Sequence, residues 1–159
     1  MERIAVKDAA IMEWVQRRAA PLLAAAVLGA VFLAAGVTKA QDVAGFFRAV
    51  QDYRVFPHAL ALGLAYFVPA LELVAGAAVL STRWRRAGAL VLGALLAAFL
   101  ILLAVSWARG LDITCGCFGE GAGPANYPLR LGRDAVLLAL AVVVFRWSTP
   151  ASEPAARTP

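Results

Sequence analysis

Four long apolar runs constrain the fold of this chain more than any other feature. A helix rises about 1.5 Å per residue, so roughly 20 apolar residues cross the ~30 Å hydrocarbon layer of a bilayer. Three runs have that length outright, and the fourth reaches it when its start is extended and Arg133 snorkels toward the interface. The runs cover residues 20–38, 58–82, 87–108 and 130–147. We therefore predict an all-α protein, an integral membrane four-helix bundle with a short interfacial helix and an outward loop.

Composition supports this class. Hydrophobic residues make up 62% of the 159 residues, whereas a soluble domain is about half apolar. The formal net charge of +5 could indicate a nucleic-acid partner, but the arginines lie at the ends of the apolar runs and form no aromatic-basic stripe. Membrane headgroups and topology explain that placement better, so the lipid bilayer is the expected partner and nucleic acid is not. A cleavable signal peptide is the rival interpretation of the first run, but its n-region would be long, and no clear small-x-small cleavage site is followed by a soluble domain.

The distribution of basic residues predicts the orientation. With four spans, one side of the membrane holds nine lysines and arginines and the other holds six. The nine are Arg3, Lys7, Arg17, Arg18, Arg83, Arg85, Arg86, Arg146 and Arg157, and the six are Lys39, Arg48, Arg54, Arg109, Arg130 and Arg133. Because positive residues stay in the cytoplasm, both termini are expected inside. The expected location is a bacterial inner membrane, with the loop after the third span on the periplasmic side, where disulfides persist.

The remaining segments complete the predicted organisation. Residues 1–18 are expected to form a cytoplasmic amphipathic segment, and residues 19–147 the single membrane domain. Residues 41–56 place apolar side chains at helical spacing, which indicates a helix lying in the outer interface. The tail, residues 148–159, is rich in proline, alanine and serine and is expected to be disordered.

The stretch 112-DITCGCFGEG-121 holds both cysteines of the chain. Cys115 and Cys117 are two residues apart, which places their Cα atoms roughly 5.5–7 Å apart, and Gly116 lets the backbone bend. A disulfide across so short a loop constrains little chain entropy and is expected to be strained and labile. Three interpretations stay open: a redox pair that cycles, a static clip or inert thiols, and half of a zinc or copper(I) site.

Glu72 lies near the middle of the second run. An ionisable group there costs about 2.5–3.5 kcal/mol on insertion scales and is usually buried against a partner or a cavity. It is either a proton relay or a contact for a quinone-like head group, or a protonated acid hydrogen-bonded inside the bundle. Lys39 is a candidate partner, but we expect it near the outer end of the first span, and that axial offset leaves a direct pair open.

Four further polar residues lie on the outer side with the cysteines. His58, the single histidine, could lower a thiol pKa or bind a metal, although interfacial histidines are more often simply polar surface residues. Arg109 could stabilise a thiolate, whereas Asp112 and Glu120 would oppose it.

These pieces together resemble a known family. The stretches 36-GVTKAQD-42, 50-VQDYRVFP-57, 69-PALELVAG-76 and 109-RGLDITCGCFG-119 are similar to the MauE branch of the DoxX-like four-helix membrane proteins. The resemblance covers about residues 20–147. Its CGCFG core is short, but it follows the third span in a chain that already carries an acid inside the second.

The resemblance implies a role in methylamine utilisation or a related maturation pathway. Proteins of this family are thought to work beside a thioredoxin-like periplasmic protein and to support disulfide formation in the small subunit of methylamine dehydrogenase, whose cofactor is tryptophan tryptophylquinone. DoxX relatives are linked to thiosulfate:quinone oxidoreduction, which makes a membrane quinone a candidate cofactor. Cys115 and Cys117 carry over as the CGC pair, and Glu72 as the intramembrane acid.

The leading hypothesis is a membrane thiol–disulfide redox protein, either a thiol–disulfide or a thiol:quinone oxidoreductase, that matures a disulfide-containing client. The second is a non-enzymatic assembly factor, in which the CGC loop docks a thioredoxin-like partner. The third is a metal-handling protein or small transporter that uses Glu72 and the outward thiols.

Overall fold

The computed structural model describes residues 19–111 and 126–148, and the secondary structure of these two segments is helical. This confirms the all-α class. The helices are α2 (Ala20–Gln41), α3 (Val43–Asp52), α4 (His58–Leu80), α5 (Arg85–Ala108) and α6 (Tyr127–Trp147). The predictions for residues 1–18, for the cysteine segment and for the tail from residue 149 lie outside the described residues.

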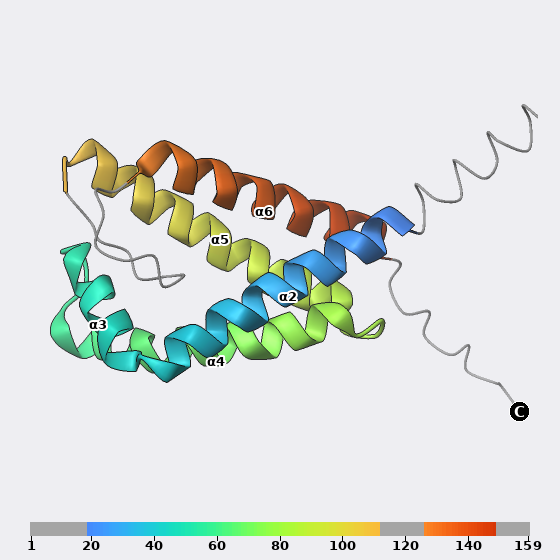
Figure 1. Ribbon diagram of the computed structural model, residues 1–159, viewed down its shortest axis with the longest axis horizontal. Coiled ribbons are helices and arrows are strands. Elements are labelled where there is room, and N and C mark those ends of the chain that lie inside the picture. Colours follow the sequence, from blue (N-terminus) through green and yellow to red (C-terminus); the bar gives the residue numbers. More distant parts are fainter. Residues whose placement is uncertain (1–18, 112–125, 149–159) are drawn as a thin grey trace, which may run out of the picture.

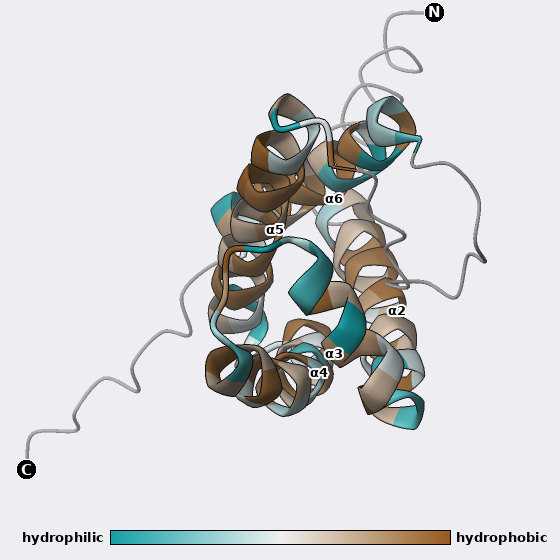
Figure 2. Ribbon diagram, turned by 90° about the vertical axis from the view of Figure 1, so that its left-hand side faces the viewer, coloured by the Kyte–Doolittle hydropathy of each residue, from teal (hydrophilic) through white to brown (hydrophobic). Residues whose placement is uncertain are grey.

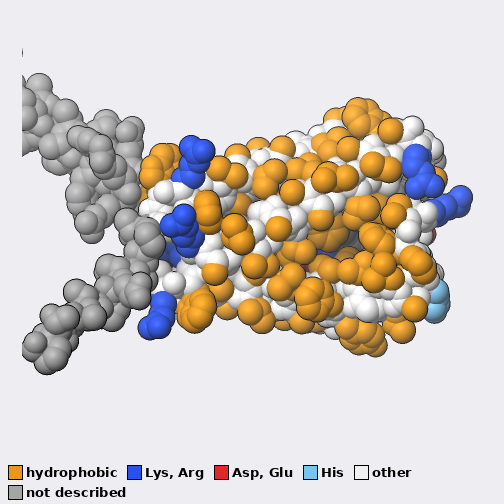
Figure 3. All heavy atoms as spheres, turned by 180° about the vertical axis from the view of Figure 1, so that it is seen from behind, with side chains coloured by type: hydrophobic (Ala, Val, Ile, Leu, Met, Phe, Trp, Pro, Cys, Tyr) orange, Lys and Arg blue, Asp and Glu red, His pale blue; other side chains and the backbone are white. Residues whose placement is uncertain are grey.

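Three of these helices are long and apolar enough to cross a membrane, judged by length and composition: α2, α4 and α5. Helix α6 has 21 residues but carries four charged side chains, so it is not among them. Figure 3 shows a broad hydrophobic belt between two ends at which lysine and arginine side chains gather. These features indicate a membrane protein, and the crossing of the bilayer by α6 stays a prediction.

The four long helices run side by side in antiparallel sequence (Figure 1). Helix α2 packs against α4 and α5 against α6, and contacts between α4 and α5 and between α2 and α6 close the ring. One end carries the start of α2, the α4–α5 turn and the end of α6. The opposite end, called here the α3 end, carries α3, the end of α5 and the start of α6, and Figure 2 views the molecule from it. The main apolar core joins all four long helices through residues such as Leu28, Val79, Leu92 and Val144.

Glycines set the register between α2 and α4. A Cβ atom at Gly29 would lie 2.7 Å from Cγ of Leu80, and one at Gly36 would lie 2.9 Å from Cγ of Leu73. Such distances are shorter than ordinary van der Waals contact, so a larger residue at either position would force the facing leucine side chain to move, and glycine lets the two helices approach closely. Residue 29 is therefore level with residues 76–80, and residue 36 with residues 69–73.

This register makes α4 extend beyond the end of α2. Continued to Gln41, it brings the end of α2 level with about residue 66, so α4 runs on for roughly eight residues, or about 12 Å. Helix α3 packs on that extension, with Phe46 and Val50 buried against Ala61 and Ala65. The turn into α3 is fixed by Asp42, whose carboxylate accepts a hydrogen bond from the Gly45 amide at 2.8 Å, as an N-cap residue does.

Candidate functional site

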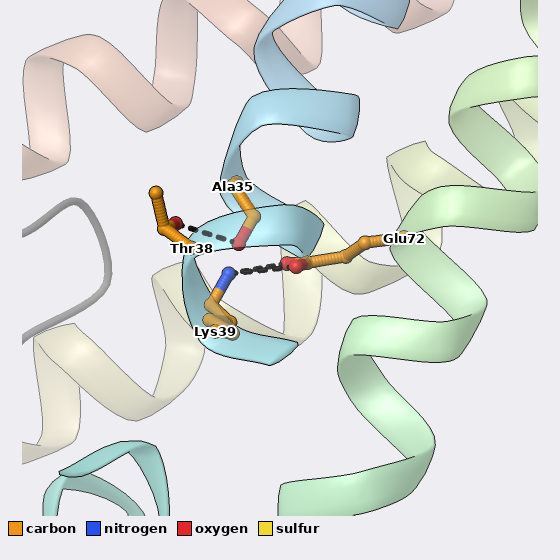
Figure 4. A network of polar contacts seen from close by, with 4 residues as sticks. All are labelled: Ala35, Thr38, Lys39 and Glu72. Atoms are coloured by element: carbon orange, nitrogen blue, oxygen red, sulfur yellow. Dashed lines mark hydrogen bonds and ion pairs between the residues drawn. The ribbon is translucent and has the colours of Figure 1, made fainter. Parts of the chain in front are cut away.

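Lys39 and Glu72 form a buried ion pair between α2 and α4. The Lys39 Nζ atom lies 2.6 Å from Oε1 and 2.8 Å from Oε2 of Glu72. The two side chains are 3% and 2% exposed, respectively. Figure 4 shows them pointing at each other from the facing sides of the two helices. Both carboxylate oxygens therefore accept from one ammonium group in a site closed to solvent and lipid.

Aromatic rings complete the surroundings of the ammonium group. Nζ lies 5.4 Å from the ring centroid of Phe46 on α3 and 5.8 Å from that of Phe99 on α5. A cation within about 6 Å of an aromatic face is attracted by the ring quadrupole, most strongly when both are desolvated. The pair therefore lies where α2, α3, α4 and α5 converge.

The axial offset expected between Lys39 and Glu72 is small in the structure, although Lys39 lies in the last turn of α2 as expected. Counting along the first run puts Lys39 near its end, whereas Glu72 lies 14 residues into α4. Because α2 stops well short of the α4 N-terminus, Lys39 is level with about residue 68 and reaches Glu72 across roughly one helical turn. An offset of one turn is within reach of the long lysine side chain, so the candidate partner named from the sequence is a direct one.

A second carboxylate lies in the same layer of the bundle. Asp134 on α6 is buried and accepts a hydrogen bond from Nε of Arg133 at 3.0 Å. The approach of Gly93 to Ala141 and Leu138 sets the α5–α6 register and places Asp134 level with about residue 99 of α5. Sequence reasoning took Arg133 as a snorkelling residue and overlooked Asp134, although an acid inside an apolar run was the available signal.

The α3 end carries a set of contacts called here the outer platform, formed by Tyr53, Trp107, Arg109, Leu111 and Tyr127. The Tyr127 hydroxyl donates a hydrogen bond to the Leu111 carbonyl, and its ring stacks on Trp107 with centroids 6.2 Å apart. Arg109 donates from Nη1 to the Tyr53 carbonyl at 3.4 Å, and Tyr53 packs against Leu111. The platform thus ties the α3–α4 link to the end of α5 and the start of α6.

The outer platform brackets the cysteine segment. Leu111 precedes that segment and Tyr127 follows it, so their hydrogen bond holds its two ends together. Cys115, Gly116, Cys117 and Asp112 themselves lie outside the described residues, and their predicted roles stay predictions.

His58 is not part of the ion-pair site. It lies at the first residue of α4, about 21 Å along the helix from Glu72. Its Nδ1 atom is 3.0 Å from Nε2 of Gln51, and its ring meets Phe47 edge-on at 5.1 Å. These contacts join the ends of α3 and α4, which is a structural role. In residues 19–111 and 126–148, no three histidine, cysteine, aspartate or glutamate side chains are grouped so that they could hold a metal.

Ser106 is a fully buried polar residue on α5. It lies on the inner face of α5, near the outer platform, and its hydroxyl oxygen has no hydrogen-bond partner among residues 19–111 and 126–148. A buried hydroxyl without a partner is unfavourable, so this position invites an explanation.

Comparison with known proteins identifies the family. The sequence profile described as "Methylamine utilisation protein MauE" matches residues 17–146. The chain is 33% identical to the protein named methylamine utilization protein MauE of Paracoccus denitrificans over 133 residues, which cover 82% of this chain and 70% of the relative. No solved structure matches the chain. The range matched by the profile begins before α2, ends at Arg146 in the last turn of α6, and covers the positions of Lys39, Glu72 and both cysteines. The chain belongs to the MauE family.

Proposed function

We propose that this protein is a thiol–disulfide redox protein of the bacterial inner membrane, in which Cys115 and Cys117 form the exchanging pair. Its client is an exported protein that acquires disulfides during methylamine utilisation, of the type of the methylamine dehydrogenase small subunit. Family membership is the observation that carries this proposal, because the relative is named for methylamine utilisation and the match includes the cysteine pair.

The exchange conserves atoms and electrons. A client thiolate attacks one sulfur of the Cys115–Cys117 disulfide and forms a mixed disulfide, and a second client thiolate then releases the client in its oxidised form. The client loses two electrons and two protons, and the cysteine pair gains them as two thiols. A membrane quinone is the proposed oxidant that restores the pair, taking up the two electrons and two protons as it becomes a quinol.

The outer platform supports this assignment. The Tyr127–Leu111 hydrogen bond and the Trp107–Tyr127 stack hold together the two points at which the cysteine segment joins the helices. An anchored segment presents its thiols to a partner from a fixed base, which lowers the entropic cost of docking. The proposed partner is a thioredoxin-like periplasmic protein, which the family resemblance implies.

The Lys39–Glu72 pair supplies a proton-handling group for the reoxidation step. Ionisable residues inside a membrane are costly and most often mark functional paths. Glu72 is the candidate proton carrier, and Lys39 is the counterion that holds it in place when it is ionised.

The test follows the thiol state of the cysteines in intact cells with a membrane-impermeant maleimide, before and after reduction. The chain has no other cysteine, so all labelling reports this pair. Labelling that appears only after reduction, with a midpoint well above about −300 mV, supports the proposal. A bond that resists reduction contradicts it, and thiols protected until a chelator is added would assign the pair to metal binding instead.

Single substitutions sharpen the test. Cys115→Ser and Cys117→Ser each leave one thiol, so one of them should trap the partner as a stable mixed disulfide. Ser148→Cys, placed in the double-serine background at the opposite end of the bundle, is a matched topology control that impermeant reagent should not reach. Client maturation by the double-serine variant would refute the redox role.

A non-enzymatic assembly factor is the second candidate. It is favoured by the closure of the Lys39–Glu72 site, where one ammonium group satisfies both carboxylate oxygens as in a structural pair. In that case, client maturation depends on the folded bundle and its outer platform but not on the thiols.

A further inference from the structure

The end of the bundle opposite α3 concentrates positive charge. Arg85 and Arg86 begin α5, Arg83 lies in the turn before it, and Arg146 lies in the last turn of α6. The four acidic residues in the described segments are elsewhere, at the α3 end or in the middle of the bundle: Asp42, Asp52, Glu72 and Asp134. We call this set of four arginines the arginine cluster, and Figure 3 shows lysine and arginine side chains gathered at that end.

One of the four arginines, Arg85, forms hydrogen bonds that stabilise the fold. Arg85 donates from Nε to the Val79 carbonyl at 3.2 Å and from Nη2 to the Leu80 carbonyl at 3.4 Å. These carbonyls belong to the last turn of α4, which has no intrahelical donors for them. Arg85 therefore caps α4, and its role is structural.

The other three arginines are exposed and have no acceptor in the described segments. Arg83, Arg86 and Arg146 make no hydrogen bond or ion pair with residues 19–111 or 126–148. Arg86 stacks its guanidinium group over the Phe145 ring at 4.6 Å, which joins α5 to α6 and orients the group. A stacked guanidinium keeps its N–H edge available for an anionic oxygen.

Apolar side chains lie directly deeper on the same two helices. Leu90 is one turn beyond Arg86 on α5 and is 58% exposed, and Val142 is one turn beyond Arg146 on α6 and is 48% exposed. Trp84 and Trp147 flank the arginines and are both 57% exposed, as aromatic residues are at a membrane–water boundary. The surface therefore changes from cationic to apolar within one helical turn.

We propose that the α5 start and the α6 end form a binding site for an anionic phospholipid. Arg86 and Arg146 hold the phosphodiester, Arg83 adds to the positive field, and the acyl chains lie along Leu90 and Val142. Charge complementarity selects this occupant, because guanidinium groups pair with phosphate oxygens and the apolar surface below accepts only a chain that lies in the membrane. The site is independent of the cysteines and of the redox proposal.

The experiment measures lipid retention by the full chain purified in a neutral detergent. The probes are phosphatidylglycerol and phosphatidylcholine with identical acyl chains, and native mass spectrometry reports the lipid that stays bound. Phosphatidylglycerol should be retained preferentially, and its retention should fall as salt rises. Equal retention of the two lipids would overturn the proposal.

Two paired substitutions locate the site. Arg86→Gln with Arg146→Gln should weaken phosphatidylglycerol binding roughly tenfold or more, since each arginine near an anionic headgroup contributes appreciably. The matched control, Arg48→Gln with Arg54→Gln, removes the same charge from exposed residues at the α3 end and should retain the lipid as the wild type does. Equal losses in both double variants would show a general charge effect and contradict a specific site.

A further double variant tests whether weaker lipid binding could result from a disturbed fold. Arg83→Gln with Arg146→Gln keeps the Arg86–Phe145 stack and so keeps the α5–α6 join, yet it should still weaken retention severalfold. Stabilisation of the protein against heat by glycerol 3-phosphate as strongly as by the lipid would indicate a soluble phosphate ligand and would overturn the lipid assignment.

Discussion

Lys39 and Glu72 are 33 residues apart in the chain, yet their charged groups meet at 2.6 Å inside the bundle. The approach is possible because α2 ends level with the middle of α4 and α3 covers the part of α4 that is left. Attraction inside a low-dielectric site is strong, but the desolvation of both charges opposes it. A buried pair of this kind is therefore weak evidence for stability and better evidence for a function that needs charge.

Removal of one member of the pair should be costly. Glu72→Gln removes the carboxylate that lies 2.6 Å from the buried Lys39 ammonium, and breaking a buried pair in this way costs about 3–5 kcal/mol. Reversible unfolding in mixed micelles would report the loss. An unfolding free energy within about 1 kcal/mol of the wild type would show that the lysine escapes to solvent or is neutral.

Removal of both members separates stability from function. Lys39→Met with Glu72→Met replaces two desolvated charges by apolar side chains and should recover most of the stability lost in Glu72→Gln. If Glu72 carries a proton, the double variant is stable and yet fails to mature the client. A stable double variant with full client maturation would leave the pair a purely structural role.

The second buried acid should matter less. Asp134→Asn removes a carboxylate whose partner, Arg133, is about a third exposed and can turn toward the interface. The expected loss is below about 1 kcal/mol, measured in the same unfolding assay as Glu72→Gln. A loss as large as that of Glu72→Gln would show that Asp134 belongs to the same charge network.

A close helix contact predicts a steric effect at Gly88. A Cβ atom there would lie 2.6 Å from the Val79 amide nitrogen and 2.8 Å from the Ala75 carbonyl oxygen, both of which are backbone atoms and cannot turn aside. Gly88→Ala should therefore push α4 and α5 apart and destabilise the protein by about 1–3 kcal/mol.

Gly63 provides the matched control for this substitution. It lies inside α4, and a Cβ atom there would meet nothing within 4 Å. Gly63→Ala should be neutral or stabilising by up to about 1 kcal/mol, because alanine favours the helix more than glycine does. The unfolding midpoints of both variants check the pair, and equal effects would contradict the close α4–α5 contact.

The positions of the helices could be predicted from the sequence, whereas the contacts between them could not. The length of each apolar run fixes a helix to within a few residues, as at Ala20 and His58. The Lys39–Glu72 contact depends on the axial register of α2 against α4, which is set by Gly29, Gly36 and the side chains they face. The sequence shows where the glycines are, but it does not show which residues of α4 they face.

Two neighbouring charged residues on α6, Arg133 and Asp134, illustrate a different limit of prediction from sequence spacing. Neighbouring residues on a helix point about 100° apart, so Arg133 and Asp134 are not expected to face each other. The long arginine side chain nevertheless curls back to the carboxylate at 3.0 Å. Spacing rules describe where Cβ atoms point, and a flexible side chain can pair outside them.

The Tyr127 hydroxyl should hold the ends of the cysteine segment together. Tyr127→Phe removes the hydrogen bond to the Leu111 carbonyl but keeps the ring that stacks on Trp107. The net loss of one such bond is about 1 kcal/mol, which corresponds to roughly fivefold faster hydrogen exchange at the Leu111 amide if that site opens locally. Tyr66→Phe, at an exposed position on α4, should leave that exchange unchanged.

Ser106 tests whether the buried hydroxyl near the outer platform serves a purpose. The hydroxyl oxygen is buried without a hydrogen-bond partner in the part of the chain that the structure describes, so it contributes an unfavourable desolvation term to the folded state. Ser106→Ala removes that term and creates only a small void, and it should therefore be neutral or stabilise the protein by up to about 1 kcal/mol. Thermal unfolding in the same micelles measures the change.

A loss of stability greater than about 1 kcal/mol in Ser106→Ala would mean that the hydroxyl is hydrogen-bonded in the membrane, to an ordered water or to a bound head group. Ser106→Thr then distinguishes the ordered water from the bound head group. The hydroxyl stays in place, but the added methyl group narrows the space beside α5, which affects the larger head group more than the water.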